Sequence, residues 1–503
     1  MTGIPGLIQT SLPRLAQPTI AAVALAYFVV VAVIGVWAMR RTRTANDFFV
    51  AGEGIGLIAL TLAAMSATVS GFAFIGGPGL VYVSGLGAVF LTLSSSVTAS
   101  MTSWVLAKRL RLLAEVRGVI TIPEAVGARY RSPAAQGWSA LAILVAVIGY
   151  MATNILALGV VIDAVFGTGL TAGVWIGMLI VLAYSATGGI LAGVYTDVFQ
   201  GALMALASTL VFVYALRAGG GMGAISRTLM ASDPEFLAPF GRIGPGAALS
   251  LFFVFGVGTM GQPHVLHKYY MLRDPRRLKW YPLLMTATLV MTMLLFFGVG
   301  VTVKALVASG RMPALARPEE ATPLFLLGYT PMLLAGLVFA GVAAAIMSTV
   351  NSFMNIGAAA LTRDLPAAFG KRVADPLRWG RIGTVVISLL AAWLALMPGA
   401  FVAFLGIFGW GLFASTLVPA LAIGLNWEGA TREGAIASIV TGLVVTLGFE
   451  TMAALNVYRF PTGVTVSAFS LVLSILVFFG VSWMTRSRAA AALDEDVVLV
   501  MRA

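Results

Sequence analysis

Two apolar stretches that are interrupted by glycine and proline decide the fold. Residues 65–85 read MSATVSGFAFIGGPGLVYVSG, and residues 255–270 read FGVGTMGQPHVLHKYY. Both residue types interrupt helices, because proline lacks a backbone amide hydrogen and glycine is conformationally free. Paired broken helices at matching positions of two halves indicate an inverted repeat with a binding site near the membrane midplane. The alternative is that these glycines only allow membrane helices to pack closely.

The composition places the chain in a membrane. Of its 503 residues, 60% are hydrophobic and only 10% are charged, whereas a soluble domain has roughly 25% charged residues. So few charges exclude a soluble enzyme, a disordered chain and a fibrous protein. The sequence contains no cysteine, which excludes disulfides and thiolate sites, and its two histidines exclude a histidine-rich metal site. It also lacks the P-loop motif of a nucleotide-driven pump.

Uncharged apolar runs predict an all-α integral membrane protein with 13 transmembrane helices. One run, 323–362, is longer than a single span requires, so we expect this helix to bend or to project from the membrane. The predicted helices lie near residues 19–39, 55–84, 86–107, 138–162, 169–188, 190–216, 246–267, 281–303, 323–362, 380–397, 400–426, 434–456 and 465–485.

The lysines and arginines predict the orientation. Successive connections between these runs lie on opposite sides of the membrane, so they divide into two sets. One set holds 23 of the 31 basic residues and the other set holds 8. The positive-inside rule places the richer set on the cytoplasmic side of the membrane, which we expect to be a bacterial-type inner (plasma) membrane. The N-terminus is then outside and the C-terminus is cytoplasmic. Because topology accounts for the net charge of +12, nothing in the sequence favours a nucleic-acid partner.

Three features inside the runs suggest function. Asp197 lies in an apolar stretch, and an acidic group at membrane depth commonly marks an ion pathway, although it could instead cap a helix at the cytoplasmic surface. Ser348 and Thr349 offer adjacent hydroxyls that either bond back to their own helix or, with helix carbonyls near Ala345, bind a cation. Tyr150 and Asn154 are one turn apart, so they either line a substrate cavity or simply pack.

Four motifs together resemble the sodium/solute symporter family. They are RTRTANDFFVAGEGIG at 41–56, GGILAGVYTDVFQG at 188–201, GQPH at 261–264 and AAIMST at 344–349. The last two are most similar to the proline-transporter branch, and the resemblance extends from about residue 20 to about residue 485.

The resemblance implies a leucine-transporter-like core of two inverted five-helix repeats, with one helix before the core and two after it. The expected segments are the extracellular N-terminus and first helix (1–45), the first repeat (46–218), an extracellular loop (219–245), the second repeat (246–428), two C-terminal helices (429–486) and a cytoplasmic tail (487–503).

The resemblance also implies a sodium site between the first and eighth core helices. Its ligands would be the backbone oxygens of Ser66, Val69 and Ala345 and the hydroxyls of Ser348 and Thr349, with Asp197 on the sodium path. The residues expected to line the substrate cavity are Thr68, Ser70, Tyr150, Asn154, Phe255, Thr259 and Gln262.

The sequence departs from the proline branch at three of these positions. Thr68 stands where that branch has an aspartate, so a charge is missing near the sodium site. Phe255 and Thr259 stand where larger aromatic groups with polar handles are expected. These differences leave the solute open.

The function expected from the resemblance is sodium-coupled import of a small organic solute by alternating access. An amino acid such as proline is the leading solute, with a monocarboxylate or a sugar derivative as alternatives. We expect no enzymatic activity and no cofactor other than sodium as the coupling ion, with the solute and membrane lipid as the other partners. The competing interpretations are a proton-coupled symporter in which Asp197 carries the proton, and a transporter-like membrane sensor.

The predicted orientation can be tested by labelling. Because the chain has no cysteine, a cysteine placed at Gly310 should react with an impermeant thiol reagent from outside intact cells, whereas one placed at Asp274 should not. The reverse labelling pattern would overturn the orientation.

Overall fold

A computed structural model describes most of the chain. The described residues are 18–39, 56–271, 275–371, 373–397, 401–458, 460–461, 463–488 and 493–503. Within these ranges the structure is helical and has no strand, which confirms the all-α class. Nine of the described helices are long and apolar enough to cross a membrane, so the predicted number of 13 is not confirmed.

The part of the chain before residue 220 begins with one helix and then forms the first half of the bundle. Its elements are α1 (Pro18–Met39), α3 (Leu57–Thr68), the π-helical η2 (Phe72–Gly76), α4 (Gly77–Ser84), α5 (Val89–Thr102), α6 (Lys108–Arg117), α7 (Ile122–Tyr130), α8 (Pro133–Phe166) and α9 (Leu170–Gly219).

The remaining chain forms the second half and the C-terminal helices. Its principal elements are α10 (Met222–Ser232), α11 (Gly244–Val257), η7 (Gly258–Gly261), α12 (Pro263–Leu266), η8 (His267–Met271), η9 (Pro275–Trp280), α13 (Tyr281–Ala308), α14 (Ala321–Tyr329), α15 (Met332–Ala359), η11 (Ala360–Asp364), α16 (Leu365–Ala368), α17 (Pro376–Ala395), α18 (Val402–Leu417), η12 (Val418–Ile423), α19 (Arg432–Ala454), α20 (Val466–Met484) and α21 (Glu495–Arg502).

Both predicted breaks are present. Helix α3 ends before Val69, whose backbone is extended (φ −86°, ψ 92°). The matching break lies at Gln262, which is also extended (φ −84°, ψ 102°) between η7 and α12. The glycine and proline residues therefore mark interrupted helices, as the sequence predicts.

One further helix prediction differs from the structure, whereas the expected bend in the run at 323–362 is confirmed. The runs predicted at 169–188 and 190–216 form one continuous helix, α9, although the side chains of 183–194 lie outside the described residues. The long run at 323–362 bends between α14 and α15, where Thr330 and Pro331 leave the helical conformation. Pro331 cannot donate a backbone hydrogen bond to the preceding turn, and this favours ending α14 there.

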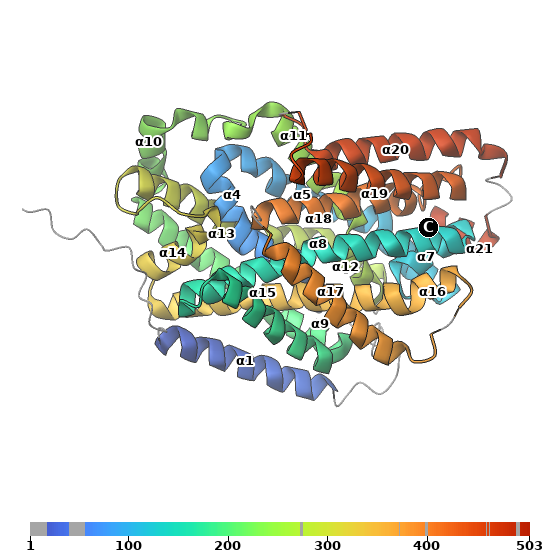
Figure 1. The fold of residues 1–503 in the computed structure, drawn as a ribbon, viewed down its shortest axis with the longest axis horizontal. Helices are drawn as coiled ribbons and strands as arrows, with labels where there is room; N and C mark the ends of the chain where they lie inside the picture. Colours follow the sequence, from blue (N-terminus) through green and yellow to red (C-terminus); the bar gives the residue numbers. More distant parts are fainter. Residues whose placement is uncertain are drawn as a thin grey trace, which may run out of the picture.

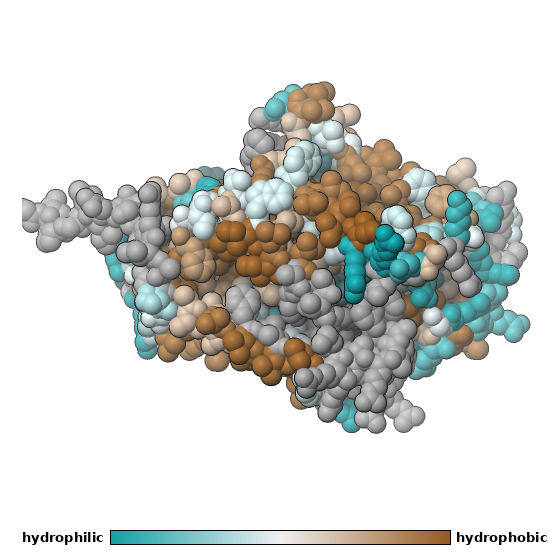
Figure 2. All heavy atoms as spheres, turned by 60° about the horizontal axis from the view of Figure 1, so that its bottom comes forward, coloured by the Kyte–Doolittle hydropathy of each residue, from teal (hydrophilic) through white to brown (hydrophobic). Residues whose placement is uncertain are grey.

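Described elements that adjoin the two sets of predicted connections lie at opposite ends of the bundle. Figure 1 shows α10 and α14 at one end and α7, α16 and α21 at the other. Exposed apolar residues cover the middle of the face in Figure 2, and hydrophilic residues gather mainly toward its ends. This distribution fits a bundle whose middle faces lipid.

The last helix of the chain, α21, docks on the bundle. Val497, Val500 and Met501 of α21 are buried, and Arg117 Nη2 lies 2.6 Å from Asp496 Oδ1. The hydrogen bond from Arg117 lowers the pKa of Asp496. This pair therefore stabilises the docked tail at neutral pH, and the stabilisation is lost when acid protonates the carboxylate.

Three basic residues that the sequence analysis counted as loop charges are buried. Arg111, Arg129 and Lys268 are 3%, 1% and 5% exposed. The Arg129 guanidinium donates to the carbonyls of Gly424 at 2.6 Å and Trp427 at 2.9 Å, so it satisfies backbone acceptors just beyond η12. Hydropathy alone does not separate such charges from solvated ones, because both interrupt an apolar run.

Candidate functional site

The break after α3 lies where three helices meet. A side chain at Gly71 would clash with both neighbouring helices, since its Cβ would lie 2.7 Å from Ala157 Cβ on α8 and 2.8 Å from Ile346 Cγ1 on α15. The Gly71 amide donates to Asn154 Oδ1 at 3.0 Å rather than to the carbonyl of Ala67, as it would in a continuous helix. The break thus leaves backbone oxygens of α3 facing other helices.

The hydroxyl of Thr349 reaches one of these oxygens. Its Oγ1 lies 2.9 Å from the carbonyl of Ala345 in its own helix and 3.2 Å from the carbonyl of Ala67 in α3. Two of the helices predicted to hold sodium therefore meet at this hydroxyl. The hydroxyl of Ser66 contacts Met204 Sδ at 3.9 Å, and Val69 occupies the extended position of the break. Ion binding by these oxygens stays a prediction.

A buried polar junction adjoins this point. Asp197 lies inside α9, so its interpretation as a helix cap is wrong. Its Oδ1 accepts a hydrogen bond of 2.5 Å from Ser348, and its Oδ2 forms an ion pair of 2.8 Å with Lys268 Nζ. The three residues are 2%, 3% and 5% exposed, respectively. Lys268 was not predicted as a site residue.

Aromatic rings surround the region between the two breaks. The ring of Phe255 stacks between Phe72 and Trp410, with centroid distances of 5.9 Å and 5.1 Å. Tyr150 meets Phe353 edge-on at 5.1 Å. These rings come from five different helical elements, and four of the five residues are at most 3% exposed.

Several polar atoms among these rings have no hydrogen-bond partner within the described residues. They are Gln262 Oε1, both ring nitrogens of His264 and Trp410 Nε1. The amide nitrogen of Gln262, by contrast, donates to the carbonyls of Gly258 at 2.9 Å and Trp410 at 3.1 Å. A buried polar atom without a partner costs about 1–3 kcal/mol, so such atoms suit a ligand that supplies the missing bonds.

The structure brings only part of the predicted substrate set to these rings. The hydroxyls of Ser70 and Tyr150 lie 3.4 Å apart. Asn154, one turn further along α8, accepts the hydrogen bond from the Gly71 amide at the break. Thr68 is half-buried and its hydroxyl bonds to the carbonyl of Ala64 at 2.7 Å. The hydroxyl of Thr259 likewise bonds to the carbonyl of Phe255 at 2.7 Å.

Phe72, His264, Phe353 and Trp410 were not predicted as site residues. Local signals existed for two of them, since the GQPH motif contains His264 and a GWG stretch surrounds Trp410. A Cβ at Gly409 would lie 2.9 Å from Tyr150 Cβ, so this glycine lets α18 approach α8 and sets the ring of Trp410 6.4 Å from that of Tyr150.

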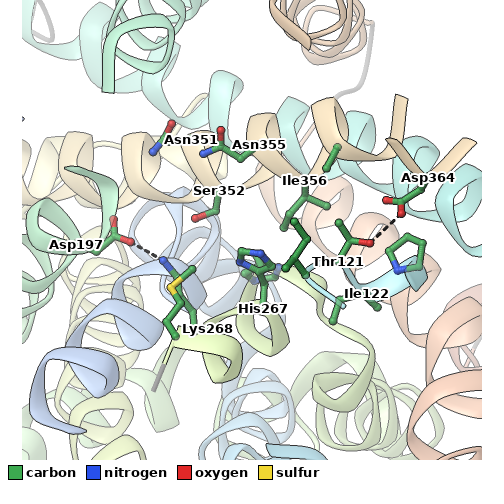
Figure 3. A pocket seen from close by; sticks show the side chains of 15 residues that line it. Thr121, Ile122, Asp197, His267, Lys268, Asn351, Ser352, Asn355, Ile356 and Asp364 are labelled. Atoms are coloured by element: carbon green, nitrogen blue, oxygen red, sulfur yellow. Dashed lines mark hydrogen bonds and ion pairs between the residues drawn. The ribbon is translucent and has the colours of Figure 1, made fainter. Parts of the chain in front are cut away.

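A small cavity of about 50 Å³ leads from the polar junction toward the end of the bundle that carries α7. Figure 3 shows Asp197 and Lys268 at one end of it and Thr121 and Asp364 at the other, with Ser352 between them on the α15 side. The hydroxyl of Thr121 donates to Asp364 Oδ1 at 2.8 Å, which joins the start of α7 to η11.

The role of Asn154 at the break can be tested by stability. Replacing Asn154→Leu should lower the free energy of unfolding by about 1–3 kcal/mol, because the Gly71 amide loses its acceptor. Thr153→Val is the control, since the hydroxyl of Thr153 bonds only weakly, at 3.5 Å, within its own helix. Thermal unfolding of the purified variants measures the difference. Equal losses in both would refute the proposed bond.

Solved structures show the fold class. A sodium-coupled sialic acid symporter matches with a TM-score of 0.75 and 19% identity, and the match covers 93% of this chain and 98% of that chain. A nucleobase-cation-symport-1 family transporter, Mhp1, matches with a TM-score of 0.52 and 17% identity over 90% of this chain and 100% of that chain. These similarities confirm the leucine-transporter-like architecture.

Curated relatives are similar over almost the whole length. The osmoregulated proline transporter OpuE of Bacillus subtilis is 28% identical over 472 residues, which are 93% of this chain and 95% of that protein. The sodium/pantothenate symporter of Escherichia coli is 27% identical over 464 residues, or 90% and 94% of the two chains. The profile of the Sodium:solute symporter family matches residues 48–442. The chain therefore belongs to the sodium:solute symporter family.

Proposed function

We propose that this chain couples inward sodium flow to the import of a small organic solute by alternating access. The observation that carries the proposal is the contact between the Thr349 hydroxyl and the Ala67 carbonyl at the break of α3. Uncharged oxygens from two helices meet there, beside a buried carboxylate. The membrane potential supplies about 2.3 kcal/mol per charge per 100 mV for such transport, so no chemical reaction and no further cofactor is needed.

The proposed sodium ligands are the carbonyls of Ser66, Val69 and Ala345 and the hydroxyls of Ser348 and Thr349. These are hard, neutral oxygens, which suit a small monovalent cation. The interrupted backbone of α3 supports the assignment, because a carbonyl near a break is released from its helical donor.

The proposed solute site lies among the aromatic rings. Its free polar atoms, Gln262 Oε1, the His264 ring nitrogens and Trp410 Nε1, would bond the polar groups of the solute, and the rings would contact its apolar part. An amino acid such as proline leads, because proline transporters are among the relatives. A monocarboxylate or a sugar derivative remains the alternative, since Thr68 replaces an aspartate of the proline branch.

We also propose that the N-terminus is outside and that the end of the bundle carrying α7, α16 and α21 is cytoplasmic. The excess of basic residues in the connections at that end supports this orientation.

A ligand screen by thermal shift tests the proposed function. Purified protein is heated with candidate amino acids, monocarboxylates and sugar derivatives, with sodium and with potassium in its place. A true solute stabilises the folded protein by mass action, and coupling requires the stabilisation to be larger in sodium. A solute that binds equally in both salts would contradict sodium coupling.

The double variant Ser348→Ala/Thr349→Ala tests the sodium site. It removes two oxygens and little volume, so we expect apparent sodium affinity to fall roughly 10-fold or more while the protein still folds. Thr362→Ala is the matched control, because its half-buried hydroxyl bonds only to the carbonyl of Ala358 at 2.7 Å. Initial uptake rates across sodium concentrations give the affinities. An unchanged sodium dependence in the double variant would remove these hydroxyls from the site.

A further inference from the structure

Lys268 is a buried cation close to the proposed sodium ligands. Its ammonium lies 2.8 Å from Asp197 Oδ2, and the other oxygen of that carboxylate accepts the Ser348 hydroxyl. In Figure 3 the Lys268 side chain points at Asp197 at one end of the cavity. The junction joins α9 to η8 and α15, so it ties the first half of the bundle to the second.

The hydrogen bond to Asp197 fixes the direction of the Ser348 hydroxyl. A serine hydroxyl has one hydrogen and two acceptor lone pairs. Since the hydrogen points to Asp197 Oδ1, the lone pairs point away from the carboxylate and can face a cation. Asp197 can therefore influence the ion without touching it, as groups outside a metal's ligand shell commonly do.

The ion pair between Lys268 and Asp197 leaves the junction without net charge. A bare carboxylate separated from a bound sodium by one hydroxyl, at about 5 Å, would strengthen binding roughly 200-fold at an effective dielectric constant of about 20. The ammonium of Lys268 cancels most of the attraction between the Asp197 carboxylate and sodium, because it pairs with that carboxylate and is buried beside it.

We propose that Lys268 sets the sodium affinity of this protein by neutralising Asp197, and that Asp197 is a positioning residue for Ser348 rather than a sodium ligand. The proposal rests on the proposed sodium site at Ser348 and Thr349. Its physical consequence is a site that binds sodium through neutral oxygens, loosely enough to release the ion at each cycle.

A charge-swap series tests the proposal. Lys268→Met keeps most of the length of the side chain and removes its charge, so sodium affinity should rise at least 10-fold and sodium release should slow. Asp197→Asn leaves the ammonium unpaired near the ion, so affinity should fall at least 10-fold. The double variant Asp197→Asn/Lys268→Met restores neutrality, and asparagine still accepts from Ser348, so affinity should return to within about 3-fold of the wild type.

Sodium-dependent thermal stabilisation of the purified protein measures the affinities without a solute. Lys268→Arg, which keeps the charge, is the control and should resemble the wild type. If Asp197 were a direct ligand, the double variant would stay as weak as Asp197→Asn, and the proposal would be refuted. Unchanged affinity in Lys268→Met would also refute it.

Three further outcomes can be told apart. If Lys268→Met does not fold because Asp197 is left as an unpaired buried charge, the comparison of Asp197→Asn with the double variant still decides the proposal. If the wild type shows no stabilisation by sodium, the proposed function fails. If the wild type responds to sodium but the double variant gives no recovery, the proposed roles of Lys268 and Asp197 fail while the proposed function stands.

Discussion

Backbone hydrogen bonding in a medium without water is the constraint on which this structure depends. Each amide or carbonyl left open inside a membrane must find a partner, so a broken helix requires neighbours with suitable side chains. At the break after α3, the Gly71 amide is taken by Asn154 and the Phe72 amide by the Ser70 hydroxyl at 3.3 Å. The Ala67 carbonyl receives the Thr349 hydroxyl. The bonds that repair the break also bring α8 and α15 to it, and thereby assemble the proposed sodium site.

The sequence predicts those features that depend on local chemistry. The breaks at Val69 and Gln262 follow from nearby glycine and proline, and the bend at Pro331 follows from a run too long for one span. The merged helix α9 was not predicted, because a short glycine pair at 188–189 reads as a turn although the backbone remains helical. Lys268 was misplaced for a related reason, since hydropathy does not show whether a charge beyond a run turns back into the protein.

The aromatic site shows the limit of such reasoning more clearly. The ring of Phe255 stacks against Phe72 on one side and Trp410 on the other. The three rings belong to η2, α11 and α18, which lie more than 100 residues apart along the chain. Only Tyr150 and Asn154, one turn apart on α8, could be paired from spacing alone. In the structure their roles differ, because Tyr150 faces the rings whereas Asn154 supports the backbone of α3. A shared helix face therefore identified the place but not the function of each residue.

One continuous helical segment carries both the proposed ion site and the end of the cavity near α7. Ser348 lies in α15, and Asp364 ends η11, which continues that helix without a gap. Asp364 lies 16 positions beyond Ser348, which corresponds to about 24 Å of helix, so a rigid helix would transmit a shift from one residue to the other. Asp364 holds Thr121 at the start of α7, and the neighbouring Arg363 pairs with Glu124. Any shift of α15 that accompanies ion binding at Ser348 therefore acts directly on the contacts with α7. Sodium can shift the equilibrium between two positions of α15 only by as much as its affinity differs between them. A site without net charge binds sodium less strongly, and this limits how far the ion can favour one arrangement of the contacts between η11 and α7.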